Sequence, residues 1–297
     1  MKSKSIVILF SVLLLISGII VLRKPSSRSL LSSRFIGTVS SVTMECRGGS
    51  YTLIKRDRDW FLEEGNVLFI CKNGIVDDFL EKLYGLEIIE TAGSSREVWG
   101  DLGVAENNHH STTLKNGNET VKLFWGKKSA GGREIFIRRN NEESVYVTAF
   151  PGNTIYTERW DWANLKIIPF DSDTSEIISL VFYRDGQKYS IIRKDFWELM
   201  FSQGTARLDS GKINLLLERI KNLKGEAARL KKDGDGMLPA GSLIINLAGN
   251  TTLSLIFLKD KKDNYFAAEK DGVYLYRINR AERNAVLPGL KYLLDHF

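Results

Sequence analysis

The chain has few of the residues on which metal sites, disulfide frameworks and nucleophilic catalysis depend. Its 297 residues include only two cysteines, three histidines and five prolines. Two cysteines are too few for a disulfide-stapled scaffold. No Gly-x-Ser-x-Gly segment occurs, so the nucleophile turn of an α/β hydrolase is absent. These absences lead us to expect a non-enzymatic protein without catalytic residues, a bound metal or a cofactor.

The short motifs that come closest to ligand sites are each incomplete. His109 and His110 are adjacent, and neighbouring residues on a strand point to opposite faces, so two such side chains rarely bind one metal ion. Residues 126–132 contain glycine, lysine and serine, but not in the order of a phosphate-binding loop, and we interpret them as a hairpin loop. Residues 233–236 lack the further acids of a calcium loop and are interpreted as a turn. The role of His109 and His110 stays open.

The acidic pairs and two of the tryptophans fit structural roles. Glu63-Glu64 and Asp77-Asp78 fall at an expected strand edge and helix start, where carboxylates are common without acting as general acids. Trp60 and Trp197 alternate with apolar neighbours. This pattern favours positions in a core over stacking on a sugar.

The excess positive charge of the chain is confined to its beginning. Six of the 42 basic residues lie within the first 40 residues, where no acidic residue occurs. The rest of the chain therefore carries 36 basic residues against 36 acidic ones. A folded part without net charge does not indicate a nucleic-acid surface, so we expect no nucleic-acid partner.

Residues 6–22 form a run without any charged residue, at the short end of what spans a bilayer. Basic residues follow the run, and neither a small-residue cleavage site nor a lipidation cysteine lies near it. We therefore expect residues 1–24 to be a retained transmembrane signal anchor that contacts the lipid bilayer through residues 6–22. The serine-rich, basic residues 25–37 are expected to form a flexible linker.

The remainder of the chain contains an internal repeat. Trp60 recurs as Trp197, an offset of 137 residues, and the stripe Val76, Phe79, Leu80, Leu83, Leu86 recurs at the same offset as Ile213, Leu216, Leu217, Ile220, Leu223. Other matched segments are Arg47-Gly48-Gly49 with Arg184-Asp185-Gly186, Gly117-Asn118-Glu119-Thr120 with Gly249-Asn250-Thr251-Thr252, and Val145-Tyr146-Val147 with Val273-Tyr274-Leu275. Because the offset falls in steps along the chain, the pattern indicates two copies that differ by loop deletions.

Each copy is expected to be a mostly antiparallel β-sheet with one packed helix, which makes the fold class α+β. Asn116-Gly117 and Gly249-Asn250 predict hairpin turns, and Asn73 and Asp209 are expected to cap the two helices. The predicted organisation is a first repeat over residues 38–150, a connector over residues 151–176 and a second repeat over residues 177–297.

Cys46 and Cys71 both lie in the first copy. Outside the cytoplasm the two thiols could form a disulfide, and the alternative is two small apolar residues buried on strands. The sequence leaves both alternatives open because it gives no geometry for the pair.

Several segments carry a family resemblance. They are Leu102-Gly103-Val104, Trp160-Asp161-Trp162-Ala163-Asn164-Leu165-Lys166-Ile167-Ile168-Pro169-Phe170, Ile177-Ile178-Ser179-Leu180 and Ala206-Arg207-Leu208-Asp209. With the helix that follows, they resemble the bacterial family catalogued as domain of unknown function 4340. Members of that family typically have one N-terminal membrane helix and an exported domain, and are often encoded beside gliding-motility-type ABC-2 transporter components. No catalytic residues are established for the family, so none carry over.

The resemblance implies a single-pass protein of the bacterial cytoplasmic (inner) membrane with an extracytoplasmic, periplasmic C-terminal domain. Our preferred hypothesis is a non-enzymatic, membrane-anchored accessory subunit that interacts with an ABC-2 transport system. The alternative is a membrane-tethered envelope enzyme or glycan-binding module that uses a cleft between the repeats. The identity of the partner, the transported substrate and the oligomeric state do not follow from the sequence.

Overall fold

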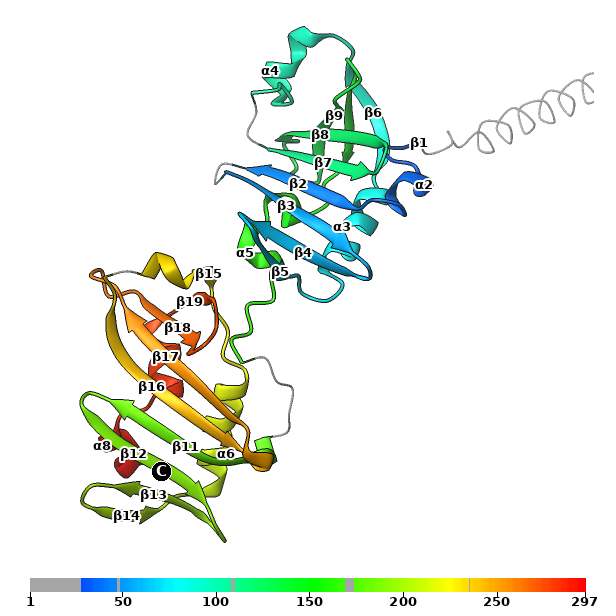
Figure 1. The fold of residues 1–297 in the computed structure, drawn as a ribbon. Coiled ribbons are helices and arrows are strands. Elements are labelled where there is room, and N and C mark those ends of the chain that lie inside the picture. Colours follow the sequence, from blue (N-terminus) through cyan, green and yellow to red (C-terminus); the bar gives the residue numbers. More distant parts are fainter. Residues whose placement is uncertain (1–27, 47–48, 108–109, 169–173, 235) are drawn as a thin grey trace, which may run out of the picture. The chain divides into compact units, whose positions relative to one another are not determined.

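The computed structural model describes residues 28–46, 49–107, 110–168, 174–234 and 236–297 (Figure 1). The expected signal anchor over residues 6–22 lies outside these ranges. Within them, no helix has the length and apolar character needed to cross a membrane. The chain divides into two compact units, with the boundary between Asn164 and Leu165.

The first unit is a ten-stranded sheet with short helices, counted over its described residues. Its elements are β1 (Arg28–Ser29), α2 (Ser33–Ile36), β2 (Ser41–Cys46), β3 (Gly49–Arg56), β4 (Asp59–Glu64), β5 (Val67–Ile70), α3 (Ile75–Tyr84), β6 (Glu87–Gly93), η1 (Arg96–Val98), α4 (Trp99–Leu102), β7 (Ser111–Asn116), β8 (Glu119–Lys128), β9 (Glu134–Arg139), β10 (Val145–Ala149), η2 (Asn153–Tyr156) and α5 (Arg159–Trp162). The strand order is β1-β6-β10-β9-β8-β7-β2-β3-β4-β5.

The second unit is a nine-stranded sheet over its described residues. Its elements are η3 (Thr174–Glu176), β11 (Ile177–Arg184), β12 (Gln187–Arg193), β13 (Trp197–Phe201), β14 (Gly204–Arg207), α6 (Ser210–Lys221), β15 (Ala227–Leu230), η4 (Lys231–Gly234), β16 (Leu238–Leu247), η5 (Ala248–Asn250), β17 (Thr252–Lys259), β18 (Tyr265–Glu269), β19 (Tyr274–Ile278), α7 (Arg280–Val286) and α8 (Leu290–His296). The strand order is β14-β13-β12-β11-β16-β17-β18-β19-β15.

The two sheets have the same topology, which confirms the internal repeat and the α+β fold class. When the strand order of the second sheet is reversed, it matches that of the first sheet from β6 onward. In this match β15 corresponds to β6, β19 to β10, and the remaining strands follow in order until β14 corresponds to β5. The described strand pairs are antiparallel in both units. The extra strand of the first sheet is the two-residue β1 at its edge.

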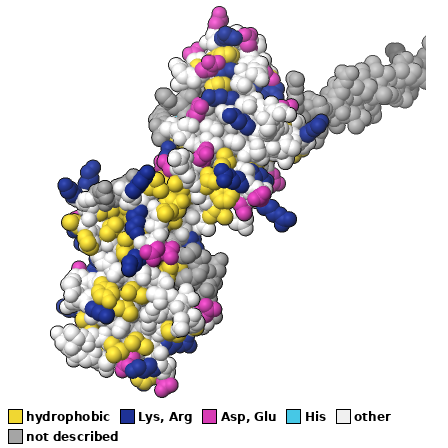
Figure 2. All heavy atoms as spheres, in the orientation of Figure 1, with side chains coloured by type: hydrophobic (Ala, Val, Ile, Leu, Met, Phe, Trp, Pro, Cys, Tyr) yellow, Lys and Arg dark blue, Asp and Glu magenta, His cyan; other side chains and the backbone are white. Residues whose placement is uncertain are grey.

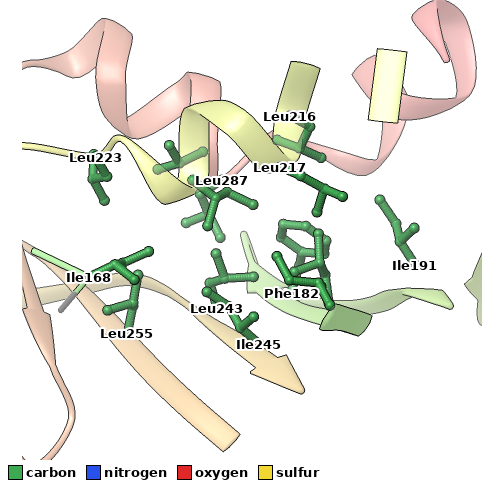
Figure 3. Packing of buried hydrophobic residues seen from close by; sticks show 14 of the residues in the cluster. Ile168, Phe182, Ile191, Leu216, Leu217, Leu223, Leu243, Ile245, Leu255 and Leu287 are labelled. Carbon is green, nitrogen blue, oxygen red and sulfur yellow. The ribbon is translucent and has the colours of Figure 1, made fainter. Parts of the chain in front are cut away.

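A helix packs against the inner face of each sheet, as its apolar stripe predicts, and in the second unit Val286, Leu287 and Leu293 from α7, α8 and the residues between them join the same core. All ten residues of the two predicted stripes are buried, from Val76 to Leu86 in the first unit and from Ile213 to Leu223 in the second. In the second unit, Leu216 and Leu217 of α6 point toward Phe182, Leu243 and Ile245 on the sheet (Figure 3). Burial of these side chains stabilises each unit.

Both predicted hairpin turns are present, but only one of the two predicted helix caps is. Gly117 and Gly249 both have a positive φ at the predicted hairpin turns, which glycine adopts without strain. Asp209 caps α6 by accepting a hydrogen bond from the Lys212 amide (2.9 Å). The prediction that Asn73 caps the first helix is wrong, because the cap of α3 is Gly74, in a left-handed conformation (φ 72°) and without a side-chain cap.

The expected connector, residues 151–176, is divided between the two units. Trp162 is 1% exposed in the first unit, and its carbonyl accepts a hydrogen bond from the Lys72 amide (2.8 Å). The carbonyl of Phe297 accepts the equivalent hydrogen bond from the Asp209 amide in the second unit (2.8 Å). Each copy therefore ends with a segment that returns to the start of its own helix, and in the first copy this segment extends to Asn164.

The beginning of each copy is also part of its fold. The amide of Leu30 donates to the Leu86 carbonyl (3.0 Å), and the amide of Ile167 donates to the Leu223 carbonyl (3.1 Å), again at an offset of 137. Leu30 is fully buried. Residues 28–37, which we expected to belong to a flexible linker, are therefore the first segment of the first unit.

Candidate functional site

The residues singled out as possible ligands do not gather into one site. The His110 ring packs edge-on against Tyr156 with 4.9 Å between ring centroids, and His109 lies outside the described residues. Asp77 accepts a hydrogen bond from Trp60 Nε1 (3.0 Å). Over the described ranges, no group of three or more His, Cys, Asp or Glu side chains is placed to hold a metal ion.

The two cysteines are too far apart to pair. Cys46 ends β2, and Cys71 follows β5, and these strands are separated in the sheet by β3 and β4. Three strand spacings of about 4.8 Å place them about 14 Å apart, whereas a disulfide needs Cα atoms within about 7 Å. Both thiols are free, and burial raises the pKa of the Cys71 thiol to about 12.

A small hollow in the first unit is built from residues that hold the unit together. It is lined by Cys46, Tyr51, His110, Tyr156, Glu158, Arg159 and Trp160. The Tyr51 hydroxyl donates to the Thr157 carbonyl and accepts from Trp162 Nε1 (2.9 Å). Arg159 Nη1 forms an ion pair with Glu64 (2.6 Å). These hydrogen bonds and this ion pair hold the closing segment of the first copy, residues 153–164, against its sheet.

The two copies differ most clearly on the outer faces of their sheets, away from α3 and α6. Because successive strand residues point to opposite faces, the outer positions can be read from the strand pairing. In the first unit they include Thr43 and Glu45 on β2, which alternate with the inward residues Val42 and Met44. In the second unit the alternating residues Leu180 and Phe182 of β11 are buried.

Strand pairing fixes which outer positions are equivalent. The first hairpin pairs Cys46 with Gly49, and its counterpart pairs Arg184 with Gln187. Equivalent residues of the two hairpins are therefore 138 positions apart. The sequence match of Arg47-Gly48-Gly49 with Arg184-Asp185-Gly186 predicted 137. The resulting equivalent pairs are Thr43 with Val181, Glu45 with Tyr183, Glu63 with Met200, and Thr113 with Ile244.

The outer face of the first sheet carries a satisfied polar network. The hydroxyls of Thr43 and Thr52 are 3.1 Å apart. Glu45 accepts hydrogen bonds from Lys122 Nζ (2.8 Å) and from the Ser111 hydroxyl (2.6 Å). These two donors, Lys122 above all, hold the pKa of the Glu45 carboxyl below its ordinary value. The face is thus suited to contact with water.

The outer face of the second sheet is apolar at the same positions. Val181 pairs with Ile244 across β11 and β16, where the first unit pairs two threonines. Tyr183 and Met200 are each 38% exposed, and they replace two glutamates. We call Val181, Tyr183, Met200 and Ile244 the outer patch. Hydrophobic side chains gather on this side of the second unit in Figure 2.

The chemistry of the outer patch is that of a contact surface. Val181 and Ile244 are partly exposed although they lie on central strands of the sheet. Exposed apolar surface of this kind marks binding sites for proteins or membranes. Since the first copy shows that this topology tolerates threonine and glutamate at these positions, the fold itself does not require the apolar residues.

A signal for the outer patch is present in the sequence, although motif searching missed it. The first strand of the first copy alternates strictly, as Ser41-Val42-Thr43-Met44-Glu45. Its counterpart contains the continuous apolar run Leu180-Val181-Phe182-Tyr183. A strand that is apolar on both faces is covered on both, so a comparison of the two copies position by position would have identified the patch.

The comparisons with known proteins give one result that bears on identity. The model of a domain of unknown function (DUF4340) matches residues 69–240. No curated protein and no solved structure matches the chain. The family match spans the helix of the first unit through to the start of β16, which is more than half of the chain, and the chain therefore belongs to the DUF4340 family.

Proposed function

We propose that this protein is a non-enzymatic, membrane-anchored accessory subunit that binds a protein partner through the outer patch. The observation that carries the proposal is the difference between the copies, in which Val181 and Ile244 replace Thr43 and Thr113 in the same sheet position. The apolar run of residues 6–22 supports membrane attachment. A tether of this kind raises the local concentration of a membrane-bound partner.

The patch also indicates the chemistry of the partner. Its four residues carry no charge, so a charged ligand such as nucleic acid gains nothing from it. A flat, apolar protein surface fits a sheet face best. The family resemblance supports a component of an ABC-2 transport system as this partner.

Exchange of the outer patch for the residues of the first copy tests this proposal. The double variant Val181→Thr plus Ile244→Thr should retain the fold but reduce the recovery of ABC-2 transporter subunits about tenfold, because two hydroxyls would be buried in the interface. The measurement is affinity purification of the full-length protein from membranes, with the recovered proteins identified by mass spectrometry.

The matched control is Thr43→Val plus Thr113→Val, which makes the opposite change in the first unit. This variant should recover the transporter subunits as the unaltered protein does. Circular dichroism should show that both variants melt as folded proteins. Failure of the unaltered protein to recover any transporter subunit would reject the partner, and equal recovery by all three proteins would reject the patch.

The location of the folded units is a separate prediction. We propose that they lie outside the cytoplasm, so alkaline phosphatase fused after Phe297 should be active, and green fluorescent protein at the same position should be dark. The physical basis is that the phosphatase requires disulfides that form in an oxidising compartment. A fluorescent and phosphatase-inactive pair of fusions would place the units in the cytoplasm.

A further inference from the structure

A cavity of the second unit adjoins the outer patch at Tyr183 but is lined mainly by charged side chains. It has a volume of about 790 Å³ and lies where the β11–β12 turn, the start of β16 and α7 meet. Five basic side chains line it, together with a single carboxylate: Arg184, Lys188, Lys259, Arg280, Arg283 and Asp185. We call this the basic pocket.

The positive charge of the basic pocket is only partly neutralised. Arg184 Nε lies 3.1 Å from Asp185, and Lys259 Nζ lies 2.9 Å from Asp263. Over the described part of the chain, Lys188, Arg280 and Arg283 form no ion pair with a carboxylate. A cluster of three unmatched cations in a concave site attracts anions.

Arg283 adds a buried donor to the pocket. Its side chain is only 6% exposed. Two guanidinium nitrogens are hydrogen-bonded, Nη2 to the Ala240 carbonyl (2.6 Å) and Nη1 to the Asn284 side-chain oxygen (2.9 Å), whereas Nε is buried without a hydrogen-bond partner in the described structure. Burial, followed by the nearby charge of Arg184, lowers the pKa of the Arg283 guanidinium. A bound anion would relieve both the burial of charge and the repulsion.

The first copy provides an internal comparison. The hairpin pairing makes Cys46 the equivalent of Arg184 and Ser50 the equivalent of Lys188. In the closing segment of the first copy, Arg159 is the basic residue, and it is already paired with Glu64. The charges of Arg184 and Lys188 are therefore specific to the second copy and are not required by the shared fold, whereas Lys259 has a basic equivalent, Lys127.

We infer that the basic pocket is a binding site for a multiply charged, phosphate-bearing anion. The exposed guanidinium of Arg280 can bind two phosphate oxygens with its planar fork. Arg184 and Arg283 donate to protein atoms and contribute mainly positive charge. The volume is within the range of small-ligand sites. The same phosphate chemistry occurs in soluble phosphate esters and in anionic lipid headgroups.

Pyrophosphate is the probe for the test. The full-length protein in neutral detergent should bind sodium pyrophosphate in isothermal titration calorimetry. The double variant Lys188→Gln plus Arg280→Gln should weaken the affinity about tenfold or more, because two charge-assisted contacts are lost. Both side chains are exposed, so the fold should be preserved. The control is Arg58→Gln plus Lys82→Gln, two exposed residues of the first unit with the same change of charge.

Two results would overturn the inference: no binding of pyrophosphate at millimolar concentration, or an equal loss in the pocket and control variants. A second experiment distinguishes the source of the phosphate. The protein is placed in phosphatidylcholine nanodiscs with or without phosphatidic acid, and pyrophosphate binding is measured again. Loss of binding only with phosphatidic acid identifies a lipid headgroup, and unchanged binding identifies a soluble phosphate ester.

Discussion

Alanine in place of Trp162 should lower the free energy of unfolding of the first unit by about 3–5 kcal/mol. The indole is 1% exposed and packs edge-on against Phe79 of α3, with 5.3 Å between ring centroids. Its Nε1 donates to the Tyr51 hydroxyl (2.9 Å). The substitution therefore leaves a cavity and also removes the partner of a buried hydroxyl.

The distribution of tryptophans makes this result measurable in the intact chain. Five of the six tryptophans precede residue 165, so tryptophan fluorescence during urea denaturation reports mainly on the first unit. The control is Trp160→Ala, because Trp160 is partly exposed and contacts Phe69 edge-on (5.3 Å). A loss of stability in the Trp162→Ala variant no larger than that in the Trp160→Ala variant would mean that the Trp162 indole does not close the core of the first unit.

Alanine at Trp60 or Trp197 should also cost about 3–5 kcal/mol, and each variant should destabilise only its own unit. Both indoles are 5% exposed. Trp60 is hydrogen-bonded to Asp77 in the first turn of α3, and Trp197 belongs to the core cluster that contains Leu216 and Leu217. The two residues thus hold the helix of each copy against its sheet.

Two probes separate the units in this experiment. Fluorescence follows mainly the first unit in both variants, and far-ultraviolet circular dichroism follows both units. In the Trp197→Ala variant, a transition seen by circular dichroism but not by fluorescence therefore belongs to the second unit. The variants Trp60→Phe and Trp197→Phe keep most of the apolar contact and should cost clearly less. Unchanged stability in both alanine variants would contradict the equivalence of the two copies.

The parts of the fold that could be predicted are those with a strong local period. The helical stripes and the hairpin turns follow from spacing and from glycine, and both are present in each copy. The cap of α3 could not be predicted from Asn73, because the backbone turns at Gly74 instead. The path of the chain from β5 into the helix determines this cap, rather than the capping preference of asparagine.

The predicted boundaries of the two copies were wrong because the short apolar segments at these boundaries show neither helical nor strand periodicity. Leu30 and Trp162 look like parts of a linker and a connector, yet both are buried by contacts with residues far away in the sequence. The candidate site was missed for a related reason. Val181 and Ile244 carry no motif, and they become informative only when strand pairing shows which residues of the first copy they replace.

The contiguity of each copy has a consequence for biosynthesis. The described strands and the closing segment of the first unit lie within residues 28–164, so this unit can complete its sheet before any described strand of the second unit reaches the compartment where the chain folds. Nascent tandem copies with equivalent strands are otherwise prone to exchange those strands and misassemble. Emergence from the N-terminus onward reduces that competition, because β2 can bond to β3 and β7 before its counterpart β11 reaches the compartment where the chain folds.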